Sequence, residues 1–159
     1  MVRILVIYDS KSGNTDKMAF AVAEGAKQVK NAEVVIKKVD QSTLEDMLEA
    51  DAVIVGSPTY YGQMSAKMKA FIDKSTKIHG QLNGKVGGAF TSSGGAACGA
   101  ETTLFSILEA LLIHGMVIQG NYDFQHFGPA AVGSPKEDDL QTCRDLGKRV
   151  AELTKRVKT

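Results

Sequence analysis

The first residues in the sequence that could form a chemical site make up a short polar loop near the start of the chain. The loop, Ser10-Lys11-Ser12-Gly13-Asn14-Thr15, follows an apolar run at 3–8 and precedes a segment of helical periodicity that begins near Asp16. A strand that turns into a helix in this way leaves backbone N–H groups without intrahelical partners, and the helix dipole adds positive charge there. The loop therefore suits a phosphate group. An ordinary capped helix start is the alternative, because Ser, Asn and Thr are common N-cap residues.

A second candidate loop carries two adjacent tyrosines. It follows the apolar run 52–56 and reads Ser57-Pro58-Thr59-Tyr60-Tyr61-Gly62-Gln63-Met64-Ser65. Tyrosine offers a flat apolar ring with a polar tip, which suits stacking on a planar heterocycle held beside a phosphate. The alternative is that Pro58 and the tyrosines pack over the following helix, with Ser65 as its cap.

A third candidate loop consists almost entirely of small residues. It reads Thr91-Ser92-Ser93-Gly94-Gly95-Ala96-Ala97-Cys98-Gly99. Without large side chains, the backbone of such a loop can approach a ligand closely, and its N–H groups can bond to the polar edge of a ring. A flexible loop that binds nothing is the alternative.

The elements between these loops predict how they are positioned. Strand-like runs at 3–8, 33–39, 52–56, 86–91 and 116–119 alternate with helical segments at 16–29, 44–48, 65–76, 101–114 and 137–157. This alternation predicts an α/β fold, a flavodoxin-like three-layer sandwich with a five-stranded parallel sheet and helices on both faces. We expect the strand order 2-1-3-4-5, in which ligands bind at the carboxyl ends of the strands. All three loops fall at such ends.

Two finer expectations concern the second half of the chain. The stretch 120–135 contains Gly128, Pro129 and Gly133 and is expected to be irregular. The helix at 101–114 is expected to bury five large apolar side chains, namely Leu104, Phe105, Leu108, Leu111 and Leu112.

Length and composition indicate a single domain over 1–159, with 43% hydrophobic and 23% charged residues. A net charge of +1 gives no electrostatic case for nucleic acid or an acidic membrane. No signal peptide or bilayer-spanning stretch is visible. The two cysteines, Cys98 and Cys143, are expected to be free thiols, with Cys143 in the core. We therefore expect a cytoplasmic protein without membrane insertion.

The sequence lacks the residues that several other kinds of site require. No Walker lysine follows Gly13, and no Gly-x-Gly-x-x-Gly follows the first strand, which argues against ATP, GTP and a Rossmann dinucleotide site. The three histidines have no ligand spacing, so no metal site is expected. Asp9 would repel a phosphate, so we expect it to face away or to cap.

These motifs together resemble a known family. The first loop looks like the FMN phosphate loop of the flavodoxins. The segment 56–65, with Lys67-Met68-Lys69-Ala70-Phe71-Ile72-Asp73 after it, is similar to the tryptophan-repressor-binding-protein type of NAD(P)H:quinone oxidoreductase. Matches at 90–95 and 114–117 extend the resemblance to essentially the whole chain.

The resemblance implies FMN as the cofactor, and it implies a role for each loop. The phosphate would be held by Ser10, Lys11, Ser12, Gly13, Asn14 and Thr15. The isoalloxazine would be bordered by Pro58, Thr59, Tyr60, Tyr61 and Gly62, and its pyrimidine edge would be bonded by Ser92, Ser93, Gly94 and Gly95. Tyr122 is a further candidate because it follows the fifth strand closely, and His114 is the candidate catalytic residue.

The chain departs from the family at three places. Ile113 replaces the first histidine of a His-His pair, Lys77 falls near a substrate-covering aromatic position, and an insertion before the third strand is absent. Two main functions stay open. One is an NAD(P)H:quinone oxidoreductase, for which a homodimer or homotetramer is the expectation. The other is an electron-transfer flavodoxin that serves protein redox partners. An FMN-dependent regulatory module is a third reading.

Overall fold

A parallel sheet forms the middle layer of the protein. The structure, a computed structural model, describes residues 1–158. The strands are β1 (Val2–Tyr8), β2 (Ala32–Lys38), β3 (Ala52–Pro58), β4 (Val86–Ser93), β5 (Val117–Ile118) and β6 (Ala130–Val132). Their order is β2-β1-β3-β4-β5, with β6 beside β4, and every pairing is parallel. The predicted fold and strand order are therefore confirmed.

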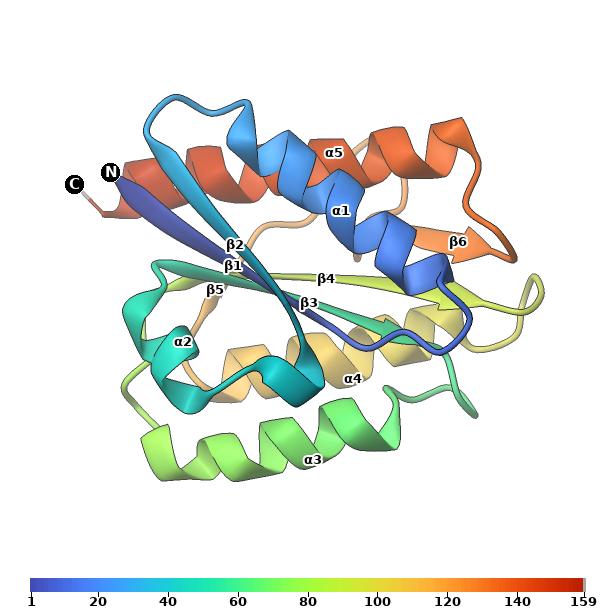
Figure 1. The fold of residues 1–159 in the computed structure, drawn as a ribbon, viewed down its shortest axis with the longest axis horizontal. Coiled ribbons are helices and arrows are strands. Elements are labelled where there is room, and N and C mark those ends of the chain that lie inside the picture. The colour runs from blue at the N-terminus through green and yellow to red at the C-terminus, as the bar shows by residue number, and fades with distance from the viewer. Residues whose placement is uncertain (159) are drawn as a thin grey trace.

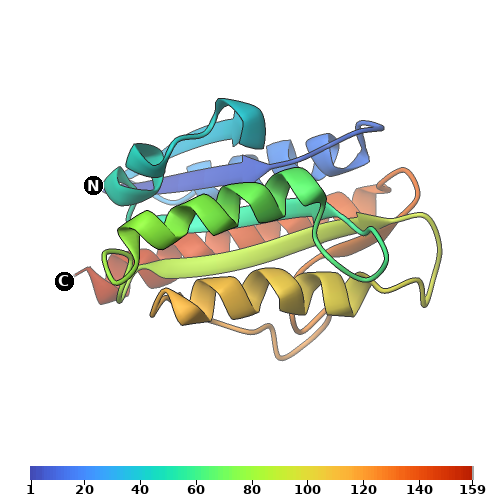
Figure 2. The same ribbon diagram turned by 90° about the horizontal axis from the view of Figure 1, so that it is seen from below.

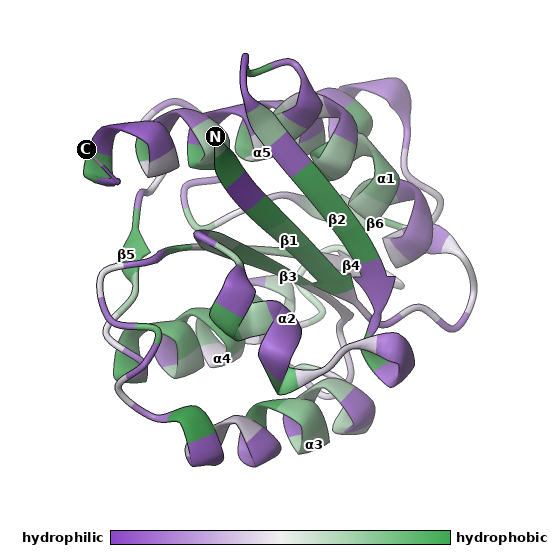
Figure 3. Ribbon diagram, turned by 60° about the vertical axis from the view of Figure 1, so that its left-hand side comes forward, coloured by the Kyte–Doolittle hydropathy of each residue, from purple (hydrophilic) through white to green (hydrophobic). Residues whose placement is uncertain are grey.

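Helices cover both faces of this sheet (Figures 1 and 2). One face carries α1 (Asn14–Lys27) and α5 (Glu137–Val157), and the other carries α2 (Leu44–Glu49), α3 (Ala66–Lys74) and α4 (Ala100–Ile113). Short 3₁₀ turns, η1 (Val39–Gln41) and η2 (Ser75–Ile78), follow β2 and α3. Two apolar clusters fill the two interlayer spaces. The central strands are mostly apolar (Figure 3), because each meets helices on both faces of the sheet.

The far edge of the sheet differs from the prediction. Only Val117 and Ile118 form β5, and the chain then loops out before returning as β6, whose Ala130 pairs with Thr91 at the end of β4. The expectation of an irregular stretch over 120–135 is wrong at this point. The edge of β4 has backbone groups that need partners, and the Thr91 amide donates to the Pro129 carbonyl at 2.9 Å.

The burial expected for α4 is also partly wrong. Leu104, Leu108 and Leu111 lie buried against the sheet, but Phe105 is 40% exposed and Leu112 is 55% exposed. The sheet-facing positions follow spacings of three and four residues, and these two side chains fall beside that stripe. Phe105 packs instead on Phe127, with ring centroids 4.5 Å apart.

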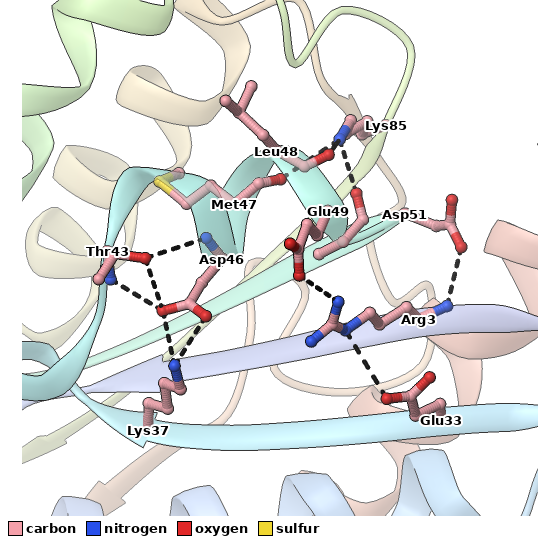
Figure 4. Close-up of polar contacts among 11 residues, drawn as sticks. Arg3, Glu33, Lys37, Thr43, Asp46, Met47, Leu48, Glu49, Asp51 and Lys85 are labelled. Atoms are coloured by element: carbon pink, nitrogen blue, oxygen red, sulfur yellow. Dashed lines mark hydrogen bonds and ion pairs between the residues drawn. The ribbon is translucent and has the colours of Figure 1, made fainter.

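Charged side chains fix α2 against the sheet (Figure 4). Lys85 donates to backbone carbonyls at the end of α2, including that of Ala50 at 2.7 Å. Lys37 on β2 pairs with Asp46 at 2.7 Å, and Asp46 also completes a capping box with Thr43. Burial alone would raise the pKa of Asp46, but the bonds from Lys37 and Thr43 outweigh it and hold that pKa below its usual value. The segment before α2 is thereby held in place at the carboxyl edge of the sheet.

Among residues 1–158, no helix combines the length and the apolar character that a membrane crossing requires.

Candidate functional site

The three candidate loops meet at the carboxyl edge of the sheet, on the right of Figure 1. The hydroxyls of Thr15 and Ser92 lie 2.8 Å apart, which joins the first loop to the third. The Thr59 amide donates to the Ser92 carbonyl at 2.8 Å, which joins the second to the third. The parallel sheet thus brings together three segments that are far apart in the sequence.

The first loop has the form of an anion site. Gly13 adopts a left-handed conformation with φ +92° and caps α1, and a β-carbon there would meet nothing within 4 Å. Ser10 Oγ accepts from the amides of Gly13 and Asp16, both at 3.2 Å, so this side chain shapes the loop from within. In the part of the chain that the structure describes, the amides of Ser12, Asn14 and Thr15 have no acceptor. Free amides at a helix start favour a bound anion.

Two carboxylates, those of Asp9 and Asp16, lie beside this loop. The Tyr8 hydroxyl donates to Asp16 Oδ1 at 2.6 Å, and burial followed by this bond raises the pKa of Tyr8. Of the two expectations for Asp9, capping is not met among residues 1–158, where its amide donates to the Gly56 carbonyl at 3.0 Å. Asp9 lines a hollow beside Lys67. Lys67 itself pairs with Asp40 at 2.9 Å, so its ammonium offsets the Asp9 carboxylate only in part.

The second loop is a tight hairpin turn with a tyrosine at its tip. Tyr60 and Gln63 exchange two backbone hydrogen bonds, at 3.1 and 3.0 Å. The residues between them, Tyr61 and Gly62, have φ of +51° and +73°. Tyr61 is fully exposed and Tyr60 is 43% exposed, so Tyr61 does not pack over the next helix. A bulky residue with positive φ is uncommon, and such strain concentrates at functional sites.

Glycines seat this turn against the start of α4. A β-carbon on Gly62 would lie 2.7 Å from Thr102 Oγ1, and one on Gly99 would lie 2.7 Å from the Gly62 Cα. The close approach leaves room for no side chain at either position. The turn therefore has a fixed place relative to the third loop.

The third loop supplies further free amides. Ser92 and Ser93 are buried at the end of β4, and Ser93 Oγ donates to the Gly95 carbonyl at 2.9 Å. Within residues 1–158, the amides of 94–97 have no acceptor. These groups can bond to a polar ring edge, whereas the Ser92 hydroxyl is already engaged by Thr15.

A hollow of about 460 Å³ lies between the first loop and the tyrosine turn. Its lining comes from the first loop and its start, and from the tyrosine turn and the start of α3, namely Asp9, Ser10, Lys11, Tyr60, Ser65, Ala66 and Lys67. The side-chain nitrogen of Lys11 has no partner among the described residues. The hollow thus joins phosphate-binding groups to an aromatic ring, which suits a phosphorylated planar ligand.

Two candidate residues, His114 and Tyr122, lie outside this hollow. His114 follows the end of α4, a helix whose 14 residues run about 21 Å away from the carboxyl edge. Tyr122 is 96% exposed on the loop between β5 and β6, where it lines a hollow with Leu108 and Ile118. The expectation for His114 as a catalytic residue is corrected accordingly. The hollow that Tyr122 lines contains no residue of the three loops, and its role as a cofactor contact stays a prediction.

His114 has a structural role in its place. It is buried, and its Nε2 lies 2.7 Å from Ser75 Oγ. Ser75 donates its own proton to the Ile72 carbonyl, so His114 Nε2 must donate and Nδ1 keeps a lone pair. Among residues 1–158, that Nδ1 has no hydrogen-bond partner. Burial lowers the pKa of His114, and the neighbouring His79 lowers it further.

The neutral state of His114 predicts a pH effect on stability. The contribution of neutral His114 to the free energy of unfolding is complete above the pKa of a histidine in the unfolded chain, about 6.5. It is lost as the pH falls below that value toward the lowered folded pKa, because the unfolded chain binds a proton that the folded chain excludes. Urea unfolding between pH 7.5 and 5 should therefore show falling stability, with a shallower slope in His114→Leu. An equal slope in His114→Leu and in a His126→Gln control would contradict this role.

Sequence reasoning missed two buried hydroxyls whose hydrogen bonds fix the backbone at the ends of β3 and β4. Ser57 Oγ accepts from the Ser65 amide at 2.8 Å, and Thr91 Oγ1 donates to the Ser57 carbonyl at 2.7 Å. Ser65 caps α3 by accepting from the Met68 amide, as the alternative for this loop has it. Polar residues at the ends of fully buried strands were the available signal.

The two cysteines stand apart from these groups. Cys143 is buried in the core as expected, and burial raises its pKa to about 12. Cys98 is exposed and free. Over residues 1–158, no three His, Cys, Asp or Glu side chains gather as a metal ion would require.

Comparisons with known proteins give the family. The sequence model of NADPH-dependent FMN reductases matches residues 37–127. The chain belongs to this family. This FMN reductase family member is 44% identical to a flavodoxin of Aquifex aeolicus (strain VF5), over 96% of this chain and 86% of the relative. It is 40% identical to an NAD(P)H dehydrogenase (quinone) of Archaeoglobus fulgidus, over 99% of this chain and all of the relative.

Solved structures agree with this placement of the family member. A WrbA-like flavodoxin from Agrobacterium tumefaciens superposes with a TM-score of 0.86 at 30% identity, over 98% of this chain and 99% of that one. A flavodoxin from the domain Archaea gives 0.80 at 31% identity, over 97% and 99%. The resemblance stated from the sequence is confirmed.

Proposed function

We propose that this protein is an FMN-dependent NAD(P)H:quinone oxidoreductase whose cofactor lies where the three loops meet. The observation that carries the proposal is the set of free amides at Ser12, Asn14 and Thr15, placed beside an exposed tyrosine turn. These groups match the two ends of FMN, a phosphate and a planar ring. The family and its quinone dehydrogenase relatives support the same reading.

Each group has a part in holding FMN. The amides and hydroxyls of 10–15 would bind the phosphate, with Lys11 adding charge. Residues 58–62 would border the ring, and the amides of Gly94 and Gly95, with Ser92 and Ser93 beneath them, would meet its polar edge. When bound, FMN supplies the two-electron chemistry, as hydride acceptor from NAD(P)H and donor to a quinone.

The protein's own contribution is binding and orientation. The fixed tyrosine turn would hold Tyr60 and Tyr61 at the ring, and their exposure leaves room for a flat substrate to stack there. The amides at the start of α1 would keep the phosphate in one place. NAD(P)H and quinone would use this open face in turn. We take residues 1–159 to be one domain and expect it to form a homodimer or homotetramer.

An electron-transfer flavodoxin is the second candidate, and a length comparison favours it. The alignment with the Archaeoglobus quinone dehydrogenase runs over 191 positions, more than the 159 residues of this chain, so that relative carries insertions that are absent here. The alignment with the Aquifex flavodoxin runs over 160 positions. A carrier would pass electrons to protein partners and would not oxidise NAD(P)H by itself.

One assay separates the two candidates. The purified chain is loaded with FMN, freed of excess cofactor, and mixed with NADPH or NADH and benzoquinone. An oxidoreductase consumes the pyridine nucleotide in proportion to protein, above the rate with free FMN alone. A yellow protein that leaves NADPH and NADH untouched would refute the enzyme and leave the carrier.

A further inference from the structure

A basic groove lies next to the proposed cofactor site. It has a volume of about 380 Å³ and runs between the segment after β2 and the outer face of α3. The two walls lie side by side in Figures 1 and 2. Three lysines line it, Lys67 and Lys74 from α3 and Lys77 from η2, against one carboxylate, Asp40. This local excess of positive charge is larger than the net charge of +1 of the whole chain.

Only one of the three lysines is neutralised. Lys67 pairs with Asp40 at 2.9 Å, which raises the pKa of Lys67. Lys74 and Lys77 are exposed and have no carboxylate partner in the part of the chain that the structure covers. The pair also removes the main repulsion that Asp40 would exert on an anion. Two free ammonium groups on one wall can bind phosphate as point charges.

The floor of the groove is apolar. Val39 and Phe71 are buried there, and Leu44 and Ala70 lie in the lining beside them. An aromatic base can rest on such a surface while phosphates meet the lysines at the rim. The combination suits a phosphorylated nucleoside better than it suits inorganic phosphate.

The groove and the cofactor hollow share one lining residue. Lys67 lines both spaces, and Tyr60 lines the hollow together with it. Lys74 is seven residues further along α3, about 10 Å along the helix axis. A pyridine dinucleotide in an extended conformation can cover this distance, with its nicotinamide at the tyrosine turn and its adenosine end near Lys74.

We propose that this groove binds the phosphorylated adenosine half of the pyridine nucleotide, with Lys74 and Lys77 on the 2′-phosphate that distinguishes NADPH from NADH. The inference rests on the proposed function for the nicotinamide end. Charge selects the ligand, since each 2′-phosphate bond to a lysine is charge-assisted. Lys74 and Lys77 would then determine the preference for NADPH over NADH, although they lie remote from the flavin.

Calorimetric titration of the FMN-loaded protein with 2′,5′-ADP tests the groove without any reaction. Wild-type protein should bind this probe more tightly than 5′-ADP. The double variant Lys74→Gln/Lys77→Gln should bind it at least about tenfold more weakly, as the loss of charge-assisted hydrogen bonds implies. The control Lys27→Gln/Lys30→Gln removes two lysines at the other side of the molecule and should bind as the wild type does.

Kinetics add a second readout. In the Lys74/Lys77 variant we expect the KM for NADPH to rise about tenfold while kcat and the KM for NADH change little, because only ground-state binding is lost. Equal 2′,5′-ADP binding by the variant and the control, or none by the wild type, would overturn the inference. If 2′,5′-ADP binds as expected but no pyridine nucleotide is oxidised, the groove stands and the proposed function fails.

Discussion

Replacing Ser12 with aspartate is expected to lower the affinity for FMN at least about a hundredfold, since apposed like charges cost several kcal/mol. Ser12 is exposed and its amide is free, so the new carboxylate would stand among the groups that bind the phosphate. The loop itself should fold normally, because Ser10, and not Ser12, makes its internal bonds. Quenching of flavin fluorescence gives the dissociation constants directly.

Ser12→Ala is the matched control for this variant. It removes the same hydroxyl without adding charge and keeps the backbone amide, so its affinity should fall by about tenfold at most, the value of one hydrogen bond. If Ser12→Asp bound FMN as tightly as Ser12→Ala, the phosphate could not lie in this loop.

Replacing Gly147 with alanine is expected to destabilise the protein by about 3 kcal/mol, at the upper end of the usual cost of overpacking. Gly147 lies on α5, where a β-carbon would sit 1.9 Å from the Val22 carbonyl oxygen of α1. Gly25 on α1 faces the Arg144 backbone in the same way, at 1.8 Å. The two helices touch backbone to backbone, so neither side can yield by rotating a side chain.

Urea or thermal unfolding measures this effect. Alanine normally favours a helix over glycine by about 1 kcal/mol, so the expected loss runs against intrinsic propensity. Lys148→Ala, the next residue and exposed, should stay within about 0.5 kcal/mol of wild type. An unchanged midpoint for Gly147→Ala would mean that α1 and α5 do not pack in this way.

The sheet and its loops were predictable because their signals are local. Strands buried on both faces must be apolar throughout, and their alternation with helices leaves few topologies. The polar loops at 10–15, 57–65 and 91–99 then fall at one edge by necessity. Their contacts, such as Thr15 with Ser92, follow from that geometry.

The errors come from features that only three-dimensional packing decides. The three residues of β6 are too short to form a pattern and pair only because the edge of β4 is open. His114 matched a motif, but the length of α4 carries it to the opposite edge. The basic groove combines Asp40 with Lys74, which come from separate elements, and no spacing in the sequence joins them.

The groove and the tyrosine turn would have separate roles in the proposed reaction. The turn would present the flavin to both substrates, while the groove would recognise only the pyridine nucleotide. A quinone has no phosphate, so it would leave the lysines unoccupied and exchange freely at the ring. Such a division would explain how one open face serves two unlike substrates.

Amide chemical shifts of the labelled protein during titration with FMN test the central claim most directly. We predict a yellow complex whose largest shift changes fall on the amides of Ser12, Asn14 and Thr15 and on those of 94–97, with His114 little affected. A chain that does not take up FMN, or shift changes centred away from the carboxyl edge of the sheet, would contradict the assignment of this site.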